Sequence, residues 1–240
     1  MPERARVRVA VGTPVVTYAL IATNVVVFLI GMAWVGVQDG GAGITAALSG
    51  DRIAIHTSFG LRGFEVADGE WWRVITSGFV HFGAIHLAMN MFGLYILGRL
   101  LEPQLGPLRF AALYGASLAG GSLGVLLLQG DALTAGASGA IYGLLAGAYV
   151  ILRNRGIDPW STGIGGWVVI SLIWTFAVPG ISIGGHLGGM VMGGLAGWIM
   201  VPPGREVRVR AGATAAAGLG LASFAAALWA ASAVTGSVLS

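Results

Sequence analysis

Apolar stretches without charged residues alternate along the chain with short polar segments. A helix needs about 20 mostly apolar residues to cross a bilayer core of about 30 Å, so each stretch of that size predicts a membrane span. Short segments of alternating polarity, typical of a transmembrane barrel, do not occur. The pattern therefore predicts an all-α, polytopic helical bundle with spans at 15–36, 79–98, 110–129, 138–152, 163–178, 183–200 and 212–236.

The spans and the segments between them predict four regions of the chain. One connection, the first loop at about 37–78, is much longer than the others, and loops of this length are often functional. Its adjacent Trp71 and Trp72 precede a span and suit the membrane interface. The regions are a basic cytoplasmic tail (1–14), a six-helix core (15–200), a cytoplasmic linker (201–211) and an additional C-terminal transmembrane helix (212–240).

Composition agrees with lipid as the solvent and excludes several kinds of chemistry. The chain is 56% hydrophobic and 10% charged, with a mean hydropathy of +0.83. Its pI is about 9.8, but the basic residues separate apolar spans instead of gathering on one face of a soluble module, so no nucleic acid partner is predicted. Cysteine is absent, which excludes disulfides, a thiolate nucleophile and a cysteine zinc site.

All thirteen basic residues are arginines, and the spans divide them between the two sides of the membrane. Arginine-rich short loops stay in the cytoplasm, which places the N-terminus inside and, after seven spans, the C-terminus outside. The first apolar run lacks a small-residue cleavage site, so it is expected to be retained as a helix of a multi-pass protein, with a bacterial plasma membrane as the expected location. Arg52, Arg62 and Arg73 lie outside, and Arg4, Arg6, Arg8, Arg99, Arg109, Arg153, Arg155, Arg205, Arg208 and Arg210 lie inside.

Glycines recur every four residues in two of the predicted spans. Such a stripe leaves one helix face smooth, so that another backbone can approach closely. We therefore expect the fourth and sixth spans to pack against each other. The stripes are Gly139, Gly143 and Gly147 in the fourth span, and Gly185, Gly189, Gly193 and Gly197 in the sixth.

Four polar residues inside the spans are candidates for function, because a polar side chain is costly in hydrocarbon. They are His86, Asn90, Ser138 and His186. The second, fourth and sixth spans run in the same direction. His86 lies early in the second, Ser138 begins the fourth and His186 comes early in the sixth, which places these three residues in the same outer layer. His86 and Asn90 are four residues apart and share a helix face, as do Ser138 and Tyr142.

These residue types indicate acyl-transfer chemistry. A serine hydroxyl is a weak nucleophile until a base accepts its proton, and His186 is placed to do so for Ser138. The predicted spans contain no carboxylate, so a Ser-His dyad is expected instead of a triad. His86, Asn90 and the Ser138 N–H are candidate donors to an oxyanion. Considered alone, Ser138 would be expected to hydrogen-bond to its own helix, and either histidine to form an interhelical hydrogen bond. The combination of these residues favours catalysis.

Several motifs resemble those of the rhomboid family of intramembrane serine proteases. Gly136-Ala137-Ser138-Gly139 is similar to its G-x-S-G motif, and HFGAIHLAMN, with His81, His86 and Asn90, is similar to its H-x-x-x-x-H-x-x-x-N run. Further matches are Trp72-Arg73 in the first loop, Glu102 to Gly106 as E-x-x-x-G, and His186, Gly189 and Gly193 as the histidine with its G-x-x-x-G helix. Gly185 departs from the family, which more often has alanine there.

The resemblance covers about residues 70–198 and implies a six-helix rhomboid-like core, here with a seventh C-terminal helix. It implies cleavage of transmembrane protein substrates near the membrane surface, in contact with membrane lipid and without a cofactor or metal. Ser138 and His186 would be catalytic, Tyr142 would pack on the histidine, and Gly136, Gly139 and Gly189 would support the site. No pattern specifies an oligomeric state.

Other readings are weighed against this one. A non-catalytic rhomboid-like protein that binds membrane proteins characteristically lacks the serine or the histidine, and this chain has both. A transporter or channel commonly has acidic or broken-helix ion sites near midplane, which the predicted spans lack. An intramembrane metalloprotease is disfavoured because no H-E-x-x-H occurs.

Overall fold

The computed structural model describes residues 12–39, 45, 48–49, 54–130 and 132–238, so most of the predicted tail at 1–14 and part of the first loop lie outside it. No strand is present among these residues, and the expected all-helical class is confirmed. The long helices are α1 (Val15–Asp39), α6 (Gly83–Leu105), α7 (Pro107–Leu128), α8 (Ser138–Asn154), α9 (Ile164–Ala177), α10 (Ile183–Met200) and α11 (Val209–Val238).

Each predicted span coincides with one of these helices. In the described part of the chain, α1, α6, α7 and α11 are long and apolar enough to cross a membrane by length and composition alone. Helix α9 is apolar but has only 14 residues, and α8 has 17. Helix α10 has 18 residues, but the face that packs on its neighbours consists of glycines, which add little to the hydrophobicity of the helix.

The second span ends later than expected. Helix α6 continues to Leu105 instead of residue 98, and it ends at Gly106, whose φ of 80° suits glycine and whose N–H donates to the Glu102 carbonyl. Pro107 then begins α7. The expectation that no span contains a carboxylate is therefore wrong, because Glu102 lies inside α6 and is buried.

The Glu102 side chain caps the N-terminal end of helix α1. Its carboxylate accepts the backbone N–H groups of Val16 and Thr17, both at 2.8 Å, and the Thr17 hydroxyl at 2.6 Å. The first N–H groups of a helix have no partner within it, and a negative charge there is favourable. The buried carboxylate is thus satisfied by a helix end and ties α1 to α6.

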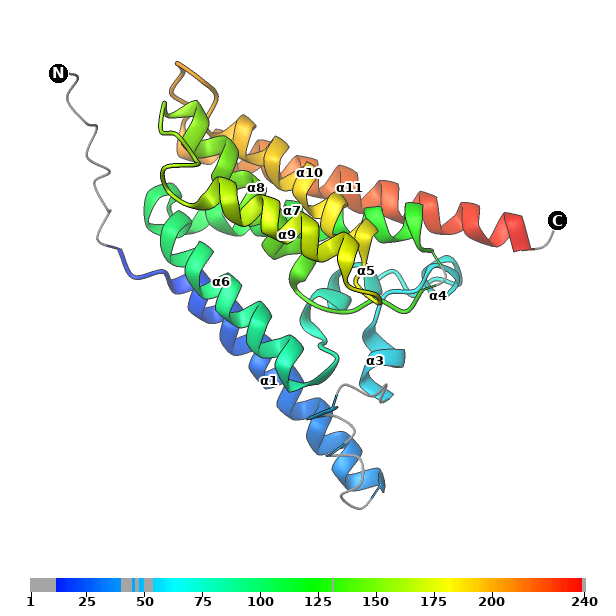
Figure 1. Ribbon diagram of the computed structural model, residues 1–240. Coiled ribbons are helices and arrows are strands. Elements are labelled where there is room, and N and C mark those ends of the chain that lie inside the picture. The colour runs from blue at the N-terminus through cyan, green and yellow to red at the C-terminus, as the bar shows by residue number, and fades with distance from the viewer. Residues whose placement is uncertain (1–11, 40–44, 46–47, 50–53, 131, 239–240) are drawn as a thin grey trace.

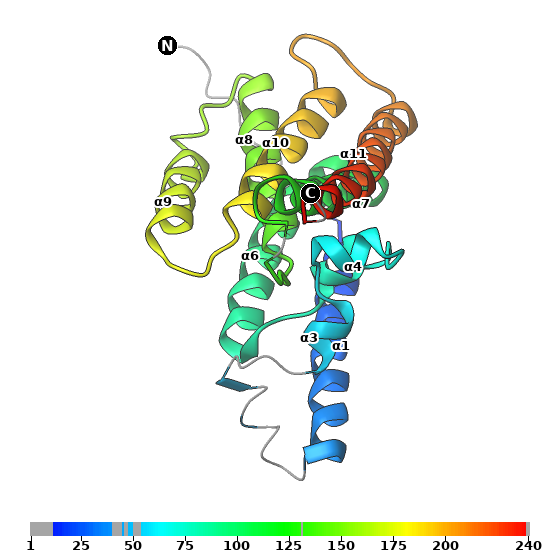
Figure 2. The same cartoon turned by 90° about the vertical axis from the view of Figure 1, so that its right-hand side faces the viewer.

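Figure 1 shows α1 and α6 side by side, inclined to a second group made of α7, α8, α10 and α11. The short helices of the first loop, α3 (Ala54–Phe59), α4 (Gly63–Ala67), α5 (Arg73–Thr76) and η1 (Ser77–Phe79), lie between the two groups. Figure 2 shows α9 at the edge of the molecule, beside α8 and α10.

The predicted packing of the two glycine stripes is confirmed. A Cβ built on Gly189 would lie 2.0 Å from the Gly139 carbonyl oxygen, and one on Gly193 would lie 2.1 Å from that of Gly143. On the neighbouring face of α10, a Cβ on Gly188 would lie 2.3 Å from the Gly120 oxygen of α7. Helix α10 thus packs on α7 and α8 at backbone distance.

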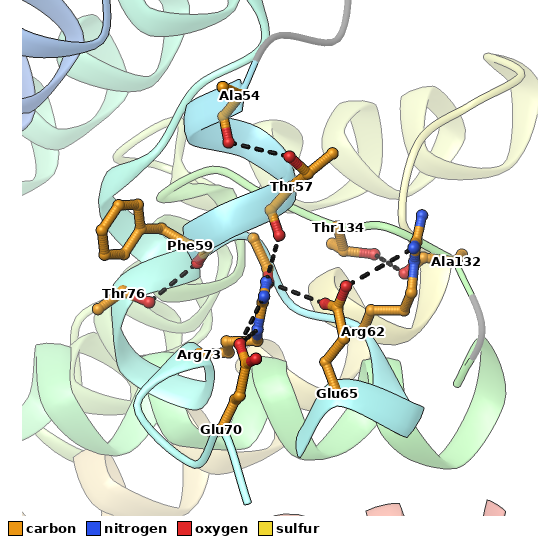
Figure 3. Close-up of polar contacts among 11 residues, drawn as sticks. Ala54, Thr57, Phe59, Arg62, Glu65, Glu70, Arg73, Thr76, Ala132 and Thr134 are labelled. Atoms are coloured by element: carbon orange, nitrogen blue, oxygen red, sulfur yellow. Dashed lines mark hydrogen bonds and ion pairs between the residues drawn. The ribbon is translucent and has the colours of Figure 1, made fainter. Parts of the chain in front are cut away.

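Buried Arg73 organises the first loop, as Figure 3 shows. Its guanidinium donates to the carbonyls of Thr57 and Gly60 at 2.7 and 2.8 Å and pairs with Glu65 and Glu70 at 2.9 and 2.6 Å. The positive charge therefore lies among acceptors from three parts of the loop and holds them together.

The first loop is also attached to the segment before α8. Leu61 and Thr134 exchange backbone hydrogen bonds of 2.8 and 2.9 Å, and the Gly136 N–H donates to the Ser77 carbonyl at 2.9 Å. The loop thereby helps to fix the residues that precede Ser138.

Helix α11 packs along α7 and reaches α4. A Cβ on Gly220 would lie 3.2 Å from the Ala116 Cα, which shows how closely α11 approaches α7. At its far end, Ala227 and Ala230 share a buried cluster with Leu61 of the first loop. The seventh helix is therefore part of the packed structure that supports this loop.

Candidate active site

Ser138 is the first residue of α8, where the sequence predicted the fourth span to begin. Gly136 precedes it with a φ of 130°, a conformation that favours glycine. A Cβ there would also lie 2.7 Å from the His86 ring. The Ala137 N–H donates to His81 Nε2 at 3.3 Å. The positive φ of Gly136 and its closeness to His86 thus explain why the motif has glycine at this position. The hydrogen bond of Ala137 helps to hold the turn that precedes Ser138.

His186 lies in the first turn of α10 and is 5% exposed. The Ser182 hydroxyl oxygen caps the helix by accepting the Gly185 N–H at 3.1 Å, and its proton goes to the Gln129 side chain at 2.9 Å. This anchored turn places His186 Nε2 at 3.0 Å from Ser138 Oγ. The distance is within reach of direct proton transfer.

The two glycine stripes of α8 and α10 pack together along a line of contact, here called the glycine seam. This seam lies directly beside Ser138 and His186. Gly139, next to Ser138, approaches α10 so closely that a Cβ on it would lie 3.1 Å from the Gly185 oxygen. Gly189, one turn after His186, meets the Gly139 backbone. The helices that carry the hydroxyl and the imidazole are therefore in contact at the level of the two side chains.

Tyr142 packs on His186, as the resemblance implied. The two rings are stacked, with centroids 3.7 Å apart and planes inclined by 19°. The Tyr142 hydroxyl donates to the Ser171 carbonyl of α9 at 3.0 Å. Tyr142 thus limits the movement of the imidazole and connects α8 to α9.

His86 and Asn90 lie on α6, across the loop from the dyad. The half-buried His86 ring adjoins Gly136 and meets the His81 ring edge-on at 5.2 Å. Asn90 is 6% exposed, and its side-chain amide donates to the His86 carbonyl at 2.9 Å. In the described residues neither side chain has a hydrogen bond to Ser138, and the His86 ring adjoins Gly136, two residues before the serine.

Sequence reasoning missed Thr175 and Ser171 on α9. The Thr175 hydroxyl lies 2.8 Å from His186 Nδ1. Both residues are buried, whereas their apolar neighbours Ile170 and Ile173 are 65% and 61% exposed. Their spacing of four residues in an apolar span, which puts them on one face, was the available signal. It was overlooked because such hydroxyls often bond their own helix.

Together these features define a multi-pass helical membrane protein with a serine and a histidine paired at the ends of two closely packed helices. Residues 68–203, more than half of the chain, match the family model described as the Rhomboid domain. The chain belongs to the rhomboid family.

Curated relatives extend the comparison. The chain is 34% identical over 186 residues to the rhomboid protease GluP of Bacillus subtilis, an alignment covering 76% of this chain and 34% of GluP. RHOMBOID-like protein 4 of Arabidopsis thaliana is 30% identical over 169 residues (64% and 40%), and RHOMBOID-like protein 5 is 31% identical over 166 residues (60% and 52%). The chain thus spans between about a third and a half of the length of these relatives.

Proposed function

We propose that this protein is an intramembrane serine endopeptidase that cleaves transmembrane substrate proteins through a dyad of Ser138 and His186. The observation that carries the proposal is the 3.0 Å contact between Ser138 Oγ and His186 Nε2. A buried imidazole at that distance from a serine is an arrangement that activates a hydroxyl nucleophile. Membership of the rhomboid family and the similarity to GluP support the same reading.

In the acylation step, Ser138 Oγ attacks the carbonyl carbon of the scissile peptide while its proton passes to His186 Nε2. The carbonyl electron pair moves onto oxygen, giving a tetrahedral oxyanion. This species collapses as the C–N bond breaks, and the protonated histidine gives its proton to the leaving nitrogen. An amine leaves and the acyl group stays on Ser138 as an ester. General acid–base catalysis of this kind contributes roughly 10²- to 10⁴-fold to rate.

Deacylation repeats these steps with water. His186 Nε2 accepts a proton from a water molecule whose oxygen attacks the ester carbon. The second tetrahedral intermediate breaks its C–Oγ bond, and the proton returns to Ser138. The pair lies near the ends of α8 and α10 and not at their middle, which lets water reach the ester from the aqueous side.

The oxyanion requires donors, and His86, Asn90 and the Ser138 N–H are the proposed set. The Ser138 N–H is at a helix N-terminus, where the first N–H groups have no partner within the helix. The His86 ring reaches the loop at Gly136, and one of the two amide hydrogens of Asn90 remains after its bond to the His86 carbonyl. Removing one such donor typically lowers kcat by about 10²- to 10³-fold.

The location of the pair defines the expected substrate. Ser138 opens α8 and His186 lies in the first turn of α10, so both are near the same membrane face. With the N-terminus in the cytoplasm and the C-terminus outside, this is the outer face. The substrate is then a membrane-spanning protein cut near its outer end, with lipid around the enzyme.

The direct test is cleavage of a single-span reporter protein in proteoliposomes. Ser138→Ala and His186→Ala should each lower cleavage by at least about 10³-fold, because members of a catalytic unit fail together. Ser223→Ala is the matched control, since Ser223 is a buried helix serine that bonds the Leu219 carbonyl on α11. It should cleave like wild type, and thermal unfolding should show all three variants folded.

Two further outcomes sharpen the test. His86→Ala and Asn90→Ala should lower kcat more than they raise KM, since an oxyanion donor acts in the transition state. Cleavage at the wild-type rate by folded Ser138→Ala or His186→Ala protein would overturn the dyad. Binding of the reporter without any cleavage by the wild type would instead favour a non-catalytic rhomboid-like protein that binds membrane proteins.

A further inference from the structure

The side of His186 that faces away from Ser138 is hydrogen-bonded to a hydroxyl of helix α9. Thr175 Oγ1 lies 2.8 Å from His186 Nδ1, and Thr175 is 1% exposed. The two ring nitrogens therefore have different partners, Ser138 on one side and Thr175 on the other. In a histidine, the hydrogen bond made by one nitrogen decides whether the other carries a proton.

The proton of Thr175 has a better acceptor than the histidine. Its hydroxyl lies 2.8 Å from the Ser171 carbonyl, which can only accept. Tyr142 donates to the same carbonyl at 3.0 Å, and a carbonyl oxygen has two lone pairs. Thr175 Oγ1 also lies 3.2 Å from the Tyr142 hydroxyl oxygen, a second acceptor. With its one proton directed to Ser171 or to Tyr142, Thr175 accepts on the side of His186. His186 Nδ1 must then carry a hydrogen, and Nε2 keeps a lone pair for the Ser138 proton.

The opposite tautomer of His186, with the hydrogen on Nε2, satisfies fewer of these hydrogen bonds. If Thr175 donated to Nδ1, the ring proton would be on Nε2 and would donate to Ser138 Oγ. The histidine would then have no lone pair for the serine proton, and the Ser171 carbonyl would lose its 2.8 Å donor. The first assignment uses every hydroxyl and ring proton of the cluster once.

Helix α9 presents this hydroxyl to the site and apolar side chains outward. Ser171 and Thr175 are buried, while Ile170, Ile173 and Trp174 are more than half exposed. Burial leaves the Nδ1–H without a competing partner from water. The hydrogen bond also persists when the ring is protonated, because Nδ1 carries a hydrogen in both forms.

We infer that Thr175 is a positioning residue that fixes the tautomer and orientation of His186, so that a neutral hydroxyl takes the place that a carboxylate has in a catalytic triad. The inference rests on the proposed function for its catalytic consequence, but the hydrogen bond itself can be tested without any activity.

The kinetic test compares Thr175→Val with Thr175→Ser in proteoliposomes. Valine keeps the shape and removes the acceptor, so kcat should fall roughly 10- to 100-fold, the usual range for a buried donor left unpaired, with little change in KM. Serine keeps the hydroxyl and should restore most of the wild-type kcat. The matched control is Thr23→Val on α1, where the hydroxyl also donates to the carbonyl four residues earlier. It should not change kcat.

The spectroscopic test reads the tautomer directly. Nitrogen-15 NMR of the four imidazoles, with the His186 signals assigned by their loss in His186→Ala, distinguishes a protonated from an unprotonated ring nitrogen. At neutral pH, wild type and Thr175→Ser should show hydrogen on Nδ1. Thr175→Val should shift His186 toward the form with hydrogen on Nε2, while Thr23→Val leaves its signals in place.

These readouts separate the two claims. Hydrogen on Nε2 in wild type, or a Thr175→Val protein with wild-type kcat and an unchanged His186 spectrum, would overturn the role of Thr175 and leave the dyad intact. A wild type that cleaves no faster than Ser138→Ala would overturn the dyad instead, and the NMR spectra would still decide whether Thr175 holds Nδ1–H.

Discussion

The two sides of His186 are held in different ways. Toward α8, helix α10 makes backbone contacts in which Gly189 and Gly193 meet the carbonyls of Gly139 and Gly143. Toward α9, the His186 ring is held by the Thr175 hydroxyl, and α9 itself packs lightly on α8 and α10 through side chains. The glycine contact between α8 and α10 is made by backbone atoms, whereas the contacts of α9 are made by side chains, which can adjust.

This difference indicates what each side controls. A seam of backbone contacts fixes the distance between two helices, because any added atom must push them apart. It therefore sets the separation between Ser138 and His186. A hydroxyl on a lightly packed helix does not set that separation, but it can decide how the imidazole is turned and protonated. The contrast predicts that damage to the seam affects folding and activity together, while damage on the α9 side affects activity more than folding.

The largest effect is expected from breaking the seam with Gly189→Ala. The added Cβ would lie 2.0 Å from the Gly139 carbonyl oxygen, and backbone cannot move aside as a flexible side chain would. Overpacking usually destabilises by about 1 to 3 kcal/mol, and a backbone contact should reach the upper end of that range. Cleavage in proteoliposomes should be lost, and the thermal midpoint should fall.

The same substitution on the open face of α10 is the control. At Gly194 the nearest atom to a built Cβ is a Val150 methyl at 3.8 Å, which is ordinary contact. Gly194→Ala should therefore leave stability within about 0.5 kcal/mol and activity unchanged. Equal losses in both variants would mean that α10 tolerates no added methyl anywhere, and the seam would have no special role.

A smaller effect is expected on the α9 side from Tyr142→Phe. The variant keeps the ring that stacks on His186 and removes the hydroxyl that donates to the Ser171 carbonyl. Loss of a hydrogen bond of this kind costs about 0.5 to 1.5 kcal/mol of stability, so the thermal midpoint should fall less than in Gly189→Ala. Because the ring still stacks on His186, kcat should fall only a few fold. A loss as deep as that of Thr175→Val would show that the Tyr142 hydroxyl, and not Thr175 alone, holds the imidazole.

The sequence predicted the seam well because its physics is local. Glycine every fourth residue can be read from the chain alone, and so can the start of a span at Ser138. The depth of His186 followed from counting residues along spans that run in the same direction. Backbone contacts then left little room for these helices to pack in any other way.

The parts that the sequence did not predict depend on distant partners. Charge near its end made the second span look shorter, but Glu102 is buried there because it caps α1. The first loop is ordered by Arg73, whose carbonyl partners have no signature in the sequence. Thr175 was missed because nothing in α9 itself distinguishes a hydroxyl that bonds its own helix from one that also reaches an imidazole.

The central claim is that His186 activates Ser138, and covalent labelling in lipid tests it most directly. The protein would be treated with a fluorophosphonate, digested and analysed by mass spectrometry, alongside Ser138→Ala, His186→Ala and Ser223→Ala. The account predicts one adduct, on Ser138, formed at the wild-type rate in Ser223→Ala and lost in the other two variants. An adduct on a different residue, or full-rate labelling of Ser138 in folded His186→Ala protein, would contradict it.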